Sequence, residues 1–480
     1  MAPYQGIIVG CSTRRPQTDH SQQDSERILH RFPLPVLRPG DGGQLAGAVS
    51  LQVCPTFNGI VLFEKKGASL FLTIFLILET LLYGYPTWRV LSAAPWSPTE
   101  MGIVIVGVVV TALLTPAYVL TIRASTLPRS IREGFAWIAY LLLAIAGVIF
   151  GLFAVRDVIW LTAWIGSYLV ENLEFVREIP IHQLNMLTLA VAAALTLYGV
   201  IGAHRTPRIR HVQVPIDDLP PALESIRIVQ LTDLHVGPTI KRPFVNRLVR
   251  AVNSVDPDLI VFTGDLADGS AESLRTDVAP LAELRCRFGP YFVTGNHEYY
   301  SDPAGWMEAL PDLGFELLLN EHRSIEWVSP PSANESAPGQ SSGQSSGESG
   351  TESGRLILGG IPDPGGEELS ESMPRHCPDP EAVFRGAPEG VRLLLAHQPR
   401  AGVRAMETTG AALTLSGHTH GGQLGLWRLL VRLQQPVVAG LARKGAGWIY
   451  VSCGVGYWGP PCRLGAPSEI TCLQLVRPQT

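Results

Sequence analysis

The chain has 480 residues, of which 46% are hydrophobic and 16% are charged, and its formal net charge is -5 at pH 7. This length exceeds one ordinary compact domain, so two or more structural units are expected. The acidic balance and the lack of a long basic run argue against a nucleic-acid partner, and seven cysteines without CxxC spacing indicate neither a zinc knuckle nor a complete disulfide framework.

The first 66 residues are rich in Pro, Gly, Gln and Arg and show no sustained apolar period. Such a composition cannot bury a core, so residues 1–66 are predicted to be a mostly disordered leader. A start site placed too far upstream would produce the same pattern. The segment has no charged region followed promptly by an apolar core and a cleavage site, which disfavours a cleavable signal peptide.

Residues 67–203 are predicted to form a transmembrane bundle. Four apolar segments of 19 to 22 residues lie in this range, at 67–85, 101–122, 134–155 and 184–203. At about 1.5 Å per residue, each can cross a hydrocarbon core of about 30 Å as a helix. A shorter apolar stretch at 158–170 suits an interfacial or re-entrant helix and is left outside the count of four.

Basic residues around these spans are distributed unevenly between the two sides. One side would carry Lys65, Lys66, Arg123, Arg129, Arg132, Arg205, Arg208 and Arg210. The basic residues on the other side are fewer and are offset by acidic ones. The positive-inside rule therefore predicts a multi-pass protein of the cell membrane whose C-terminal half faces the cytoplasm. A fifth crossing at 158–170 would place that half outside.

From residue 205 the sequence changes to short β-branched runs that alternate with loops and amphipathic stretches. This texture predicts an α/β domain over 205–480. One interruption, at 329–354, consists of Ser, Gly, Glu and Pro with almost no apolar residue. Such a segment cannot contribute to a core, so it is predicted to be a disordered surface insertion.

Five runs of this domain share one layout, in which a β-like apolar stretch ends in polar residues. The runs are 226–231, 259–263, 291–294, 391–396 and 412–416, and the polar residues at or after their ends include Asp233, His235, Asp265, Asn296, His397, His418 and His420. Ligand sites of α/β proteins gather at the carboxyl ends of strands, so these side chains are expected to converge on one centre.

The seven side chains comprise four imidazoles, two carboxylates and one amide. Mixed imidazole and carboxylate donors suit Mn, Fe, Zn or Co, whereas calcium prefers an all-oxygen set. Seven donors exceed the roughly four to six that one such ion takes, and a carboxylate can bridge two ions. Two divalent metal ions are therefore predicted.

These runs resemble the five signature blocks of the calcineurin-like metallophosphoesterases. The blocks are DxH from Asp233, GDxxD from Gly264, GNHE from Gly295, a lone histidine at His397, and GHxH from Gly417. Their order and spacing also match, and the resemblance covers about residues 205–476. With the preceding bundle, the chain is most similar to transmembrane proteins with a metallophosphoesterase domain. The resemblance implies a four-layer αββα sandwich.

The resemblance also implies a role for each site residue. One metal would be held by Asp233, His235 and His420, the other by Asn296, His397 and His418, with Asp265 bridging the two. His297 would contact the phosphate and protonate or stabilise the leaving oxygen. Asp268 and Glu298 would orient histidines. The nucleophile would be a metal-bound hydroxide that attacks phosphorus in line.

One departure from the family pattern concerns the substrate. Protein phosphatases of this family continue GDxxD with an arginine, whereas Gly269 follows Asp268 here. Loss of this phosphate clamp favours diesters or pyrophosphates over monoesters. Arg463 is either a partial replacement for the clamp or an ordinary surface residue.

A domain tethered beside a bilayer meets lipid phosphates at high local concentration. Lipid-linked substrates are therefore favoured, and a UDP-diacylglucosamine-type pyrophosphate is one candidate. The alternative function is a catalytically inactive membrane scaffold or sensor. Such a protein would be expected to lack metal ligands or the GNHE histidine, and this chain keeps both. The sequence does not predict an oligomeric state.

Overall fold

The computed structural model describes residues 77–118, 126–328 and 353–478. The predicted leader, the start of the first predicted span and all but the last two residues of the predicted insertion lie outside these described residues.

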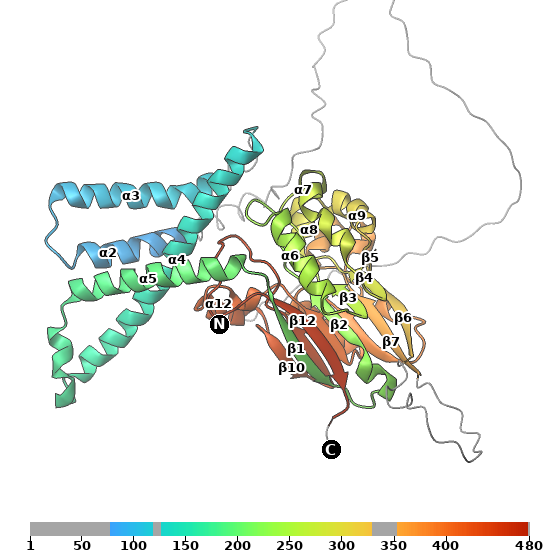
Figure 1. The fold of residues 1–480 in the computed structure, drawn as a ribbon. Coiled ribbons are helices and arrows are strands. Elements are labelled where there is room, and N and C mark those ends of the chain that lie inside the picture. Colours follow the sequence, from blue (N-terminus) through green and yellow to red (C-terminus); the bar gives the residue numbers. More distant parts are fainter. Residues whose placement is uncertain (1–76, 119–125, 329–352, 479–480) are drawn as a thin grey trace, which may run out of the picture. The chain divides into compact units, whose positions relative to one another are not determined.

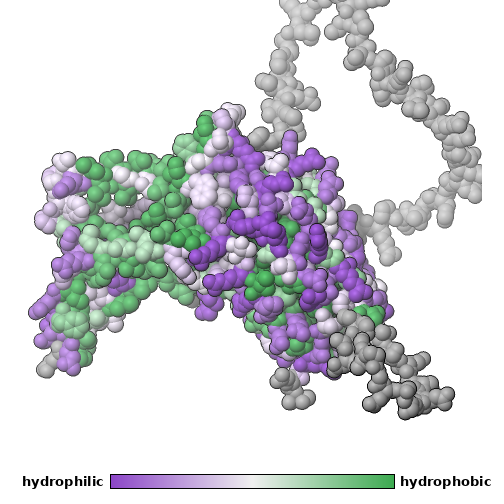
Figure 2. Space-filling model, viewed as in Figure 1, coloured by the Kyte–Doolittle hydropathy of each residue, from purple (hydrophilic) through white to green (hydrophobic). Residues whose placement is uncertain are grey.

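Helices dominate the described residues before 205. The first predicted span is helical from residue 77 and continues through η1 (Thr80–Gly84) into α2 (Tyr85–Leu91). The elements that follow are α3 (Pro98–Ala117), α4 (Arg129–Gly166), η3 (Glu171–Glu178) and α5 (Ile181–His204). Among the described residues, α3, α4 and α5 are long and apolar enough to cross a membrane. Figure 2 shows apolar surface gathered over these helices.

Helix α4 joins two stretches that the sequence analysis treated separately. Its 38 residues contain the predicted third span and also residues 158–166 of the shorter apolar stretch. Arg156 and Asp157 lie between the two stretches, and both side chains have polar partners. Asp157 forms an ion pair with Arg89 at 2.6 Å, and Arg156 donates to Asn185 Oδ1 at 2.7 Å. At about 57 Å, the helix is longer than a hydrocarbon core of about 30 Å.

The beginning of α4 and the end of α5 both contact the α/β domain. Arg129 pairs with Asp277 of that domain, and Lys241 pairs with Glu133. Helix α5 leads within four residues into the first strand. The N-terminal end of α4 and the C-terminal end of α5 are therefore held on the same side of the helices.

The described part of the domain contains two six-stranded sheets, and Figure 1 labels several of their strands. The first has the order β1 (Arg208–Pro215), β12 (Glu469–Val476), β2 (Arg227–Leu231), β3 (Leu259–Phe262), β4 (Phe288–Phe292) and β5 (Glu316–Leu317). The second has the order β10 (Gly440–Lys444), β11 (Gly447–Val451), β9 (Leu413–Ser416), β8 (Val391–Leu395), β7 (Ser353–Gly360) and β6 (Glu321–Val328).

Three apolar clusters show that the sheets are stacked between helices. The cluster between the sheets includes Ile228 and Val261 from the first and Leu393 and Leu415 from the second. Helices α6 (Arg242–Asn253), α7 (Ala271–Val278) and α9 (Pro303–Asp312) pack on the outer face of the first sheet, and α10 (Pro380–Val383) and α11 (Pro399–Thr409) on that of the second. Alternate faces of each strand therefore serve two cores, and the predicted four-layer αββα sandwich is confirmed.

The five predicted apolar runs correspond to β2, β3, β4, β8 and β9. Strands β2, β3 and β4 pair in parallel in the first sheet, and β8 and β9 do so in the second. Parallel neighbours end at the same edge of a sheet. The loops after the five strands consequently meet at one end of the sandwich.

Candidate metal centre

The loops after these strands adopt a backbone conformation that L-residues rarely use. Five of the seven predicted ligands have positive φ: Asp233 (54°), His235 (50°), Asp265 (58°), His418 (70°) and His420 (50°). A positive φ is unfavourable for residues other than glycine. Residues in this conformation tend to cluster at functional sites, where the surrounding structure holds them in place.

Two glycines allow these loops to approach closely. A Cβ at residue 295 would lie 2.2 Å from Asp265 Oδ1, and one at residue 417 would lie 2.1 Å from Thr232 Oγ1. Both distances are far shorter than any van der Waals contact. The GNHE and GHxH blocks thus require Gly295 and Gly417 so that the ligand-bearing loops can touch.

One group of candidate ligands consists of Asp233, His235 and His420. His235 Nε2 lies 3.1 Å from His420 Nε2, which is 3.5 Å from Asp233 Oδ1. Two ring nitrogens that face each other at this distance cannot both carry a proton, whereas both can present lone pairs to one cation. This group fits a metal ion.

A second group consists of Asp265, His397 and His418. His397 Nε2 lies 3.1 Å from Asp265 Oδ2 and 3.3 Å from His418 Nδ1. His397 Nδ1 donates a hydrogen bond to the Thr263 carbonyl at 2.7 Å. With its proton on Nδ1, a neutral imidazole has a lone pair on Nε2 that can bind a metal. This group has the same donor chemistry as the first.

Asn296 supplies independent support for the second position. Its side chain lines a cavity that His235, Asp265 and His418 also line. Its Oδ1 atom is buried and has no hydrogen-bond donor among the described residues. Leaving a buried acceptor unsatisfied costs about 1–3 kcal/mol. A cation beside Asn296, His397 and His418 would remove this penalty, so the residues present fit a second metal.

Asp265 lies between the two groups. Its Oδ2 atom is 3.6 Å from His235 Nε2 and 3.1 Å from His397 Nε2, while its Oδ1 accepts the His297 backbone N–H at 2.9 Å. Burial opposes its ionisation, but the His397 and His297 imidazoles outweigh burial and hold the pKa of this carboxyl well below its ordinary value. An anionic carboxylate in this position can serve two cations at once.

Two of the histidines are kept neutral by their surroundings. Burial, assisted by the charge of His397, lowers the pKa of His418 to about 3, and burial also lowers the pKa of His420 well below its ordinary value. A neutral imidazole keeps the lone pair that metal binding requires. The structure thus brings all seven predicted ligand side chains together. Burial opposes the charged form of His397, but Asp265 outweighs burial and raises its pKa well above the ordinary value, so a metal at this position would displace a proton from His397.

Comparisons with known proteins agree with this geometry. Residues 226–422 match the family model described as calcineurin-like phosphoesterase. The chain is 38% identical over 319 residues to a Bos taurus transmembrane protein with metallophosphoesterase domain, covering 66% of this chain and 67% of that protein. It is 31% identical over 315 residues to an uncharacterized metallophosphoesterase of Helicobacter pylori, covering 65% and 76%. The chain belongs to the calcineurin-like phosphoesterase family.

A Danio rerio transmembrane protein with metallophosphoesterase domain is 37% identical over 295 residues, or 61% of this chain. The match spans 62% of that relative's length. The common region is therefore large but leaves part of each protein unmatched.

The GDxxD and GNHE blocks of this phosphoesterase are joined through Asp268 and His297. Asp268 Oδ1 lies 2.9 Å from His235 Nδ1 and 2.6 Å from His297 Nδ1. Burial disfavours the charged form of His297, but Asp265 and Asp268 outweigh burial and raise its pKa to about 9. His297 also groups with His235 and Asp265 as a candidate metal ligand. Because its pKa is raised, His297 can hold a proton beside the candidate metal centre, where the leaving oxygen of a phosphoester would need one.

Glu298 has a different environment from the one expected. It was predicted to orient histidines, but its carboxylate accepts hydrogen bonds from the backbone N–H groups of Asp265 (3.0 Å), Leu266 (2.7 Å) and Gly295 (2.6 Å). Burial is the main cause that raises its pKa to about 7. Glu298 therefore fixes the backbone of two ligand loops, because a carboxylate can accept from several N–H groups at once.

Arg463 was predicted to be either a phosphate clamp or a surface residue, and both interpretations are wrong. Its side chain is buried and donates to the carbonyls of Gly456 (2.8 Å), Ala466 (2.9 Å) and Cys453 (2.8 Å). Its Nη2 also lies 3.2 Å from His420 Nδ1. These contacts occupy the guanidinium, which therefore holds the C-terminal loop in place beside the His420 ring and does not face a substrate.

Sequence analysis did not identify Asp363 as part of this region. It follows β7, and its Oδ1 accepts from Gln398 Nε2 at 3.1 Å, beside His397. Burial raises the pKa of Asp363 to about 6. The sequence contains a pattern that could have identified Asp363, because β7 is an apolar strand followed by a polar residue, as in the five runs described above.

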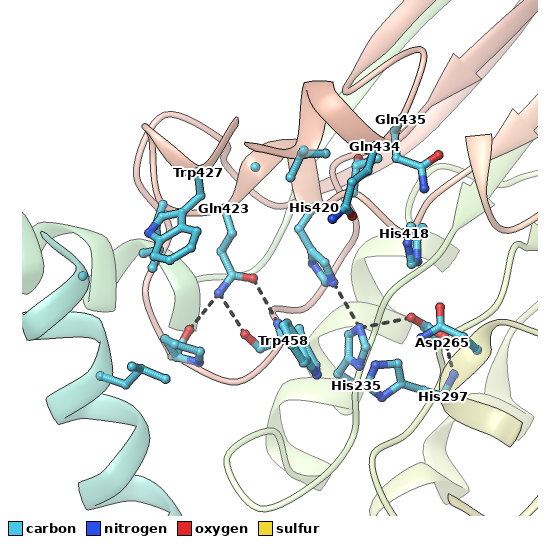
Figure 3. A pocket seen from close by; sticks show the side chains of 18 of the residues that line it. His235, Asp265, His297, His418, His420, Gln423, Trp427, Gln434, Gln435 and Trp458 are labelled. Carbon is cyan, nitrogen blue, oxygen red and sulfur yellow. Dashed lines mark hydrogen bonds and ion pairs between the residues drawn. The ribbon is translucent and has the colours of Figure 1, made fainter. Parts of the chain in front are cut away.

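A cavity of about 520 Å³ opens beside the centre. Figure 3 shows His235, Asp265, His297, His418 and His420 facing one part of it, with Trp427 and Gln434 from α12 (Trp427–Gln434) along another. The cavity thus continues from the candidate metal centre to a helix that the sequence analysis left unassigned.

Proposed function

We propose that this chain is a membrane-anchored, metal-dependent phosphohydrolase with a dinuclear centre. The observation that carries the proposal is Asp265, one ionised carboxylate that reaches a histidine of each candidate ligand group. Together the two groups and Asn296 offer the seven donors that two divalent ions require. Mn, Fe, Zn and Co all suit this donor set.

Two bound divalent ions would supply an activated water and positive charge beside the phosphate. The remaining chemistry falls to the chain itself. His297, held by Asp268 at 2.6 Å, donates a proton toward the leaving oxygen. Asp268 also fixes the His235 ring, and Glu298 fixes the loops that carry Asp265 and Asn296. These contacts hold the reacting geometry in place before the substrate arrives.

The proposed substrates are phosphodiesters or pyrophosphates, in particular lipid-linked ones. The absence of an arginine after Asp268 removes the contact that a doubly charged monoester would use most. The Arg463 guanidinium, which might have replaced it, is directed to backbone carbonyls. Apolar helices in the same chain favour a lipid-linked pyrophosphate of the UDP-diacylglucosamine type.

The domain is proposed to face the cytoplasm in a multi-pass arrangement. The basic residues beside the spans support this orientation through the positive-inside rule. The ion pair between Arg129 and Asp277 also supports it, because it keeps the basic N-terminal end of α4 next to the domain that follows α5.

A test is to assay purified full-length protein in detergent with each candidate metal, using EDTA-treated protein as control. The substrates would be an aryl phosphodiester, the matching monoester and a UDP-diacylglucosamine. We expect metal-dependent hydrolysis of the diester or the pyrophosphate. Folded, metal-loaded protein that hydrolyses none of them would favour the alternative, an inactive scaffold or sensor.

A further inference from the structure

Helix α12 presents an apolar stripe that the described residues leave largely exposed. None of its eight residues is buried, and Leu429 and Leu433 are 59% and 79% exposed. At about 100° per residue, Leu429 and Leu433 share one side of the helix with Leu430 and with Leu426, which immediately precedes it. A side this apolar is unfavourable in water, so it indicates a contact surface.

The other two sides of α12 have distinct characters. Arg428 and Arg432 are exposed and lie one turn apart, on a different side from the leucines. Trp427, Val431 and Gln434 line the cavity that contains the metal-centre histidines, as Figure 3 shows for Trp427 and Gln434. The helix therefore forms a wall of the candidate active site with one side and displays leucines with another.

The surroundings of α12 identify a bilayer as the occupant of the leucine stripe. A Cβ at Gly151 of α4 would lie 3.2 Å from Leu426 Cδ1, and one at Gly147 would lie 3.7 Å from Trp427 Nε1. The start of α12 thus packs on a helix that is apolar and long enough to span a membrane. Its leucines lie beside a span of the same chain.

The depth of the contact supports the same occupant. Trp137 of α4 stacks on His204 at the end of α5, where the helices meet the domain. Gly147 is ten residues further along α4, or about 15 Å of helix. A contact this far along a helix that can span a membrane suits an interfacial helix, because such helices bury their apolar side about 5–10 Å into the boundary between headgroups and acyl chains. Arg428 and Arg432 provide the basic side that such helices direct toward lipid headgroups.

We propose that α12 is an interfacial helix. Its leucine stripe inserts into the bilayer, and the cavity behind it receives the chain of an amphiphilic phosphoester whose phosphate reaches the metal centre. Leu82 and Leu143 of the apolar helices also line this cavity, so its far end is apolar while its near end carries the imidazoles. The part about the substrate rests on the proposed phosphohydrolase function, whereas the part about the helix does not.

The helix is tested by a nitroxide at L433C, with V328C, an exposed apolar position at the end of β6, as matched control. The background keeps the buried Cys453, Cys462 and Cys472 and has serine at the other cysteines. Full-length protein is placed in nanodiscs of phosphatidylcholine and phosphatidylglycerol. We expect the label at 433 to be accessible to oxygen and protected from an aqueous nickel chelate, and the label at 328 to show the reverse.

Two results would overturn the interfacial helix. Nickel accessibility at 433 equal to that at 328 would place the stripe in water. Protection at 433 from both reagents would mean that protein covers the stripe, and dipolar broadening between labels would identify a second copy of this chain as that protein.

The cavity is tested with two esters that share one scissile bond, p-nitrophenyl methyl phosphate and p-nitrophenyl decyl phosphate. We expect kcat/KM to be at least about tenfold higher for the decyl ester, because burial of methylene groups adds binding. V431N should reduce that ratio by at least about threefold, and V328N should leave the ratio unchanged. Equal kcat/KM for both esters would overturn the assignment. If the wild type cleaves neither ester nor the UDP-diacylglucosamine with any metal, the proposed function fails, and the nitroxide result still decides the helix.

Discussion

Replacing Asp268 with alanine removes a carboxylate that contacts two imidazoles of the site through their Nδ1 atoms. Asp268 Oδ1 lies 2.9 Å from His235 Nδ1, on a candidate metal ligand, and 2.6 Å from His297 Nδ1, on the proposed proton donor. D268A should therefore weaken metal binding and proton donation together, whereas H297A should affect proton donation alone. D268N, whose amide oxygen can accept from one ring, should lie between D268A and the wild type.

The magnitude follows from the two contacts. Removing the partner of a metal-ligating histidine typically costs about 10–100-fold in metal affinity or activity, and losing a proton donor costs about 100-fold or more in rate. We therefore expect D268A to lower kcat by about 1,000-fold at subsaturating metal and H297A by about 100-fold with its metals retained. Because Asp268 acts partly through His297, the double variant should fall less than the product of the single effects.

The assay is kcat on an aryl phosphodiester across a metal titration, with bound metal measured in each variant. Two outcomes would refute the reasoning. One is a D268A enzyme within about twofold of wild type at every metal concentration, and the other is full additivity with H297A. Equal loss of metal in H297A would instead make His297 a metal ligand.

Three further predictions address stability, substrate and orientation. R463M should lower the free energy of unfolding by about 3–5 kcal/mol, because it leaves several buried carbonyls without a donor; an unchanged melting temperature would contradict this. An aryl phosphodiester should have a higher kcat/KM than its monoester at one pH and metal concentration, since Gly269 replaces the clamping arginine, and a monoester preference of about tenfold or more would reverse this assignment. A reporter phosphatase that works only outside the membrane should be silent after Gln479 and active at Asn172; a bright C-terminal fusion would place the domain outside.

The site was predictable because each part of it is local in sequence. Strands β2 and β3 are short apolar runs, and the polar residues after them are read directly from the chain. The parallel pairing of those strands then brings Asp233 and Asp265 to one edge. The sequence thus shows which residues are the donors, and their positions after parallel strands predict that they lie close together.

Features that depend on distant partners were not predictable. Arg156 and Asp157 interrupt an apolar run and suggested a helix boundary, but contacts with Arg89 and Asn185 let α4 continue through them. Arg463 can be buried because backbone carbonyls from the surrounding loops accept hydrogen bonds from its guanidinium. Neither arrangement can be inferred from neighbouring residues alone, since the partners are set by tertiary packing.

The central claim is that one carboxylate, Asp265, holds two metals for hydrolysis. The most direct measurement is the metal content per chain of purified wild type and D265N, by mass spectrometry, together with phosphodiester hydrolysis by the same samples. We expect about two metals per chain in the wild type, a lower content in D265N, and no hydrolysis by D265N, because an amide cannot offer two anionic oxygens. Full activity of D265N with about two metals per chain would contradict it.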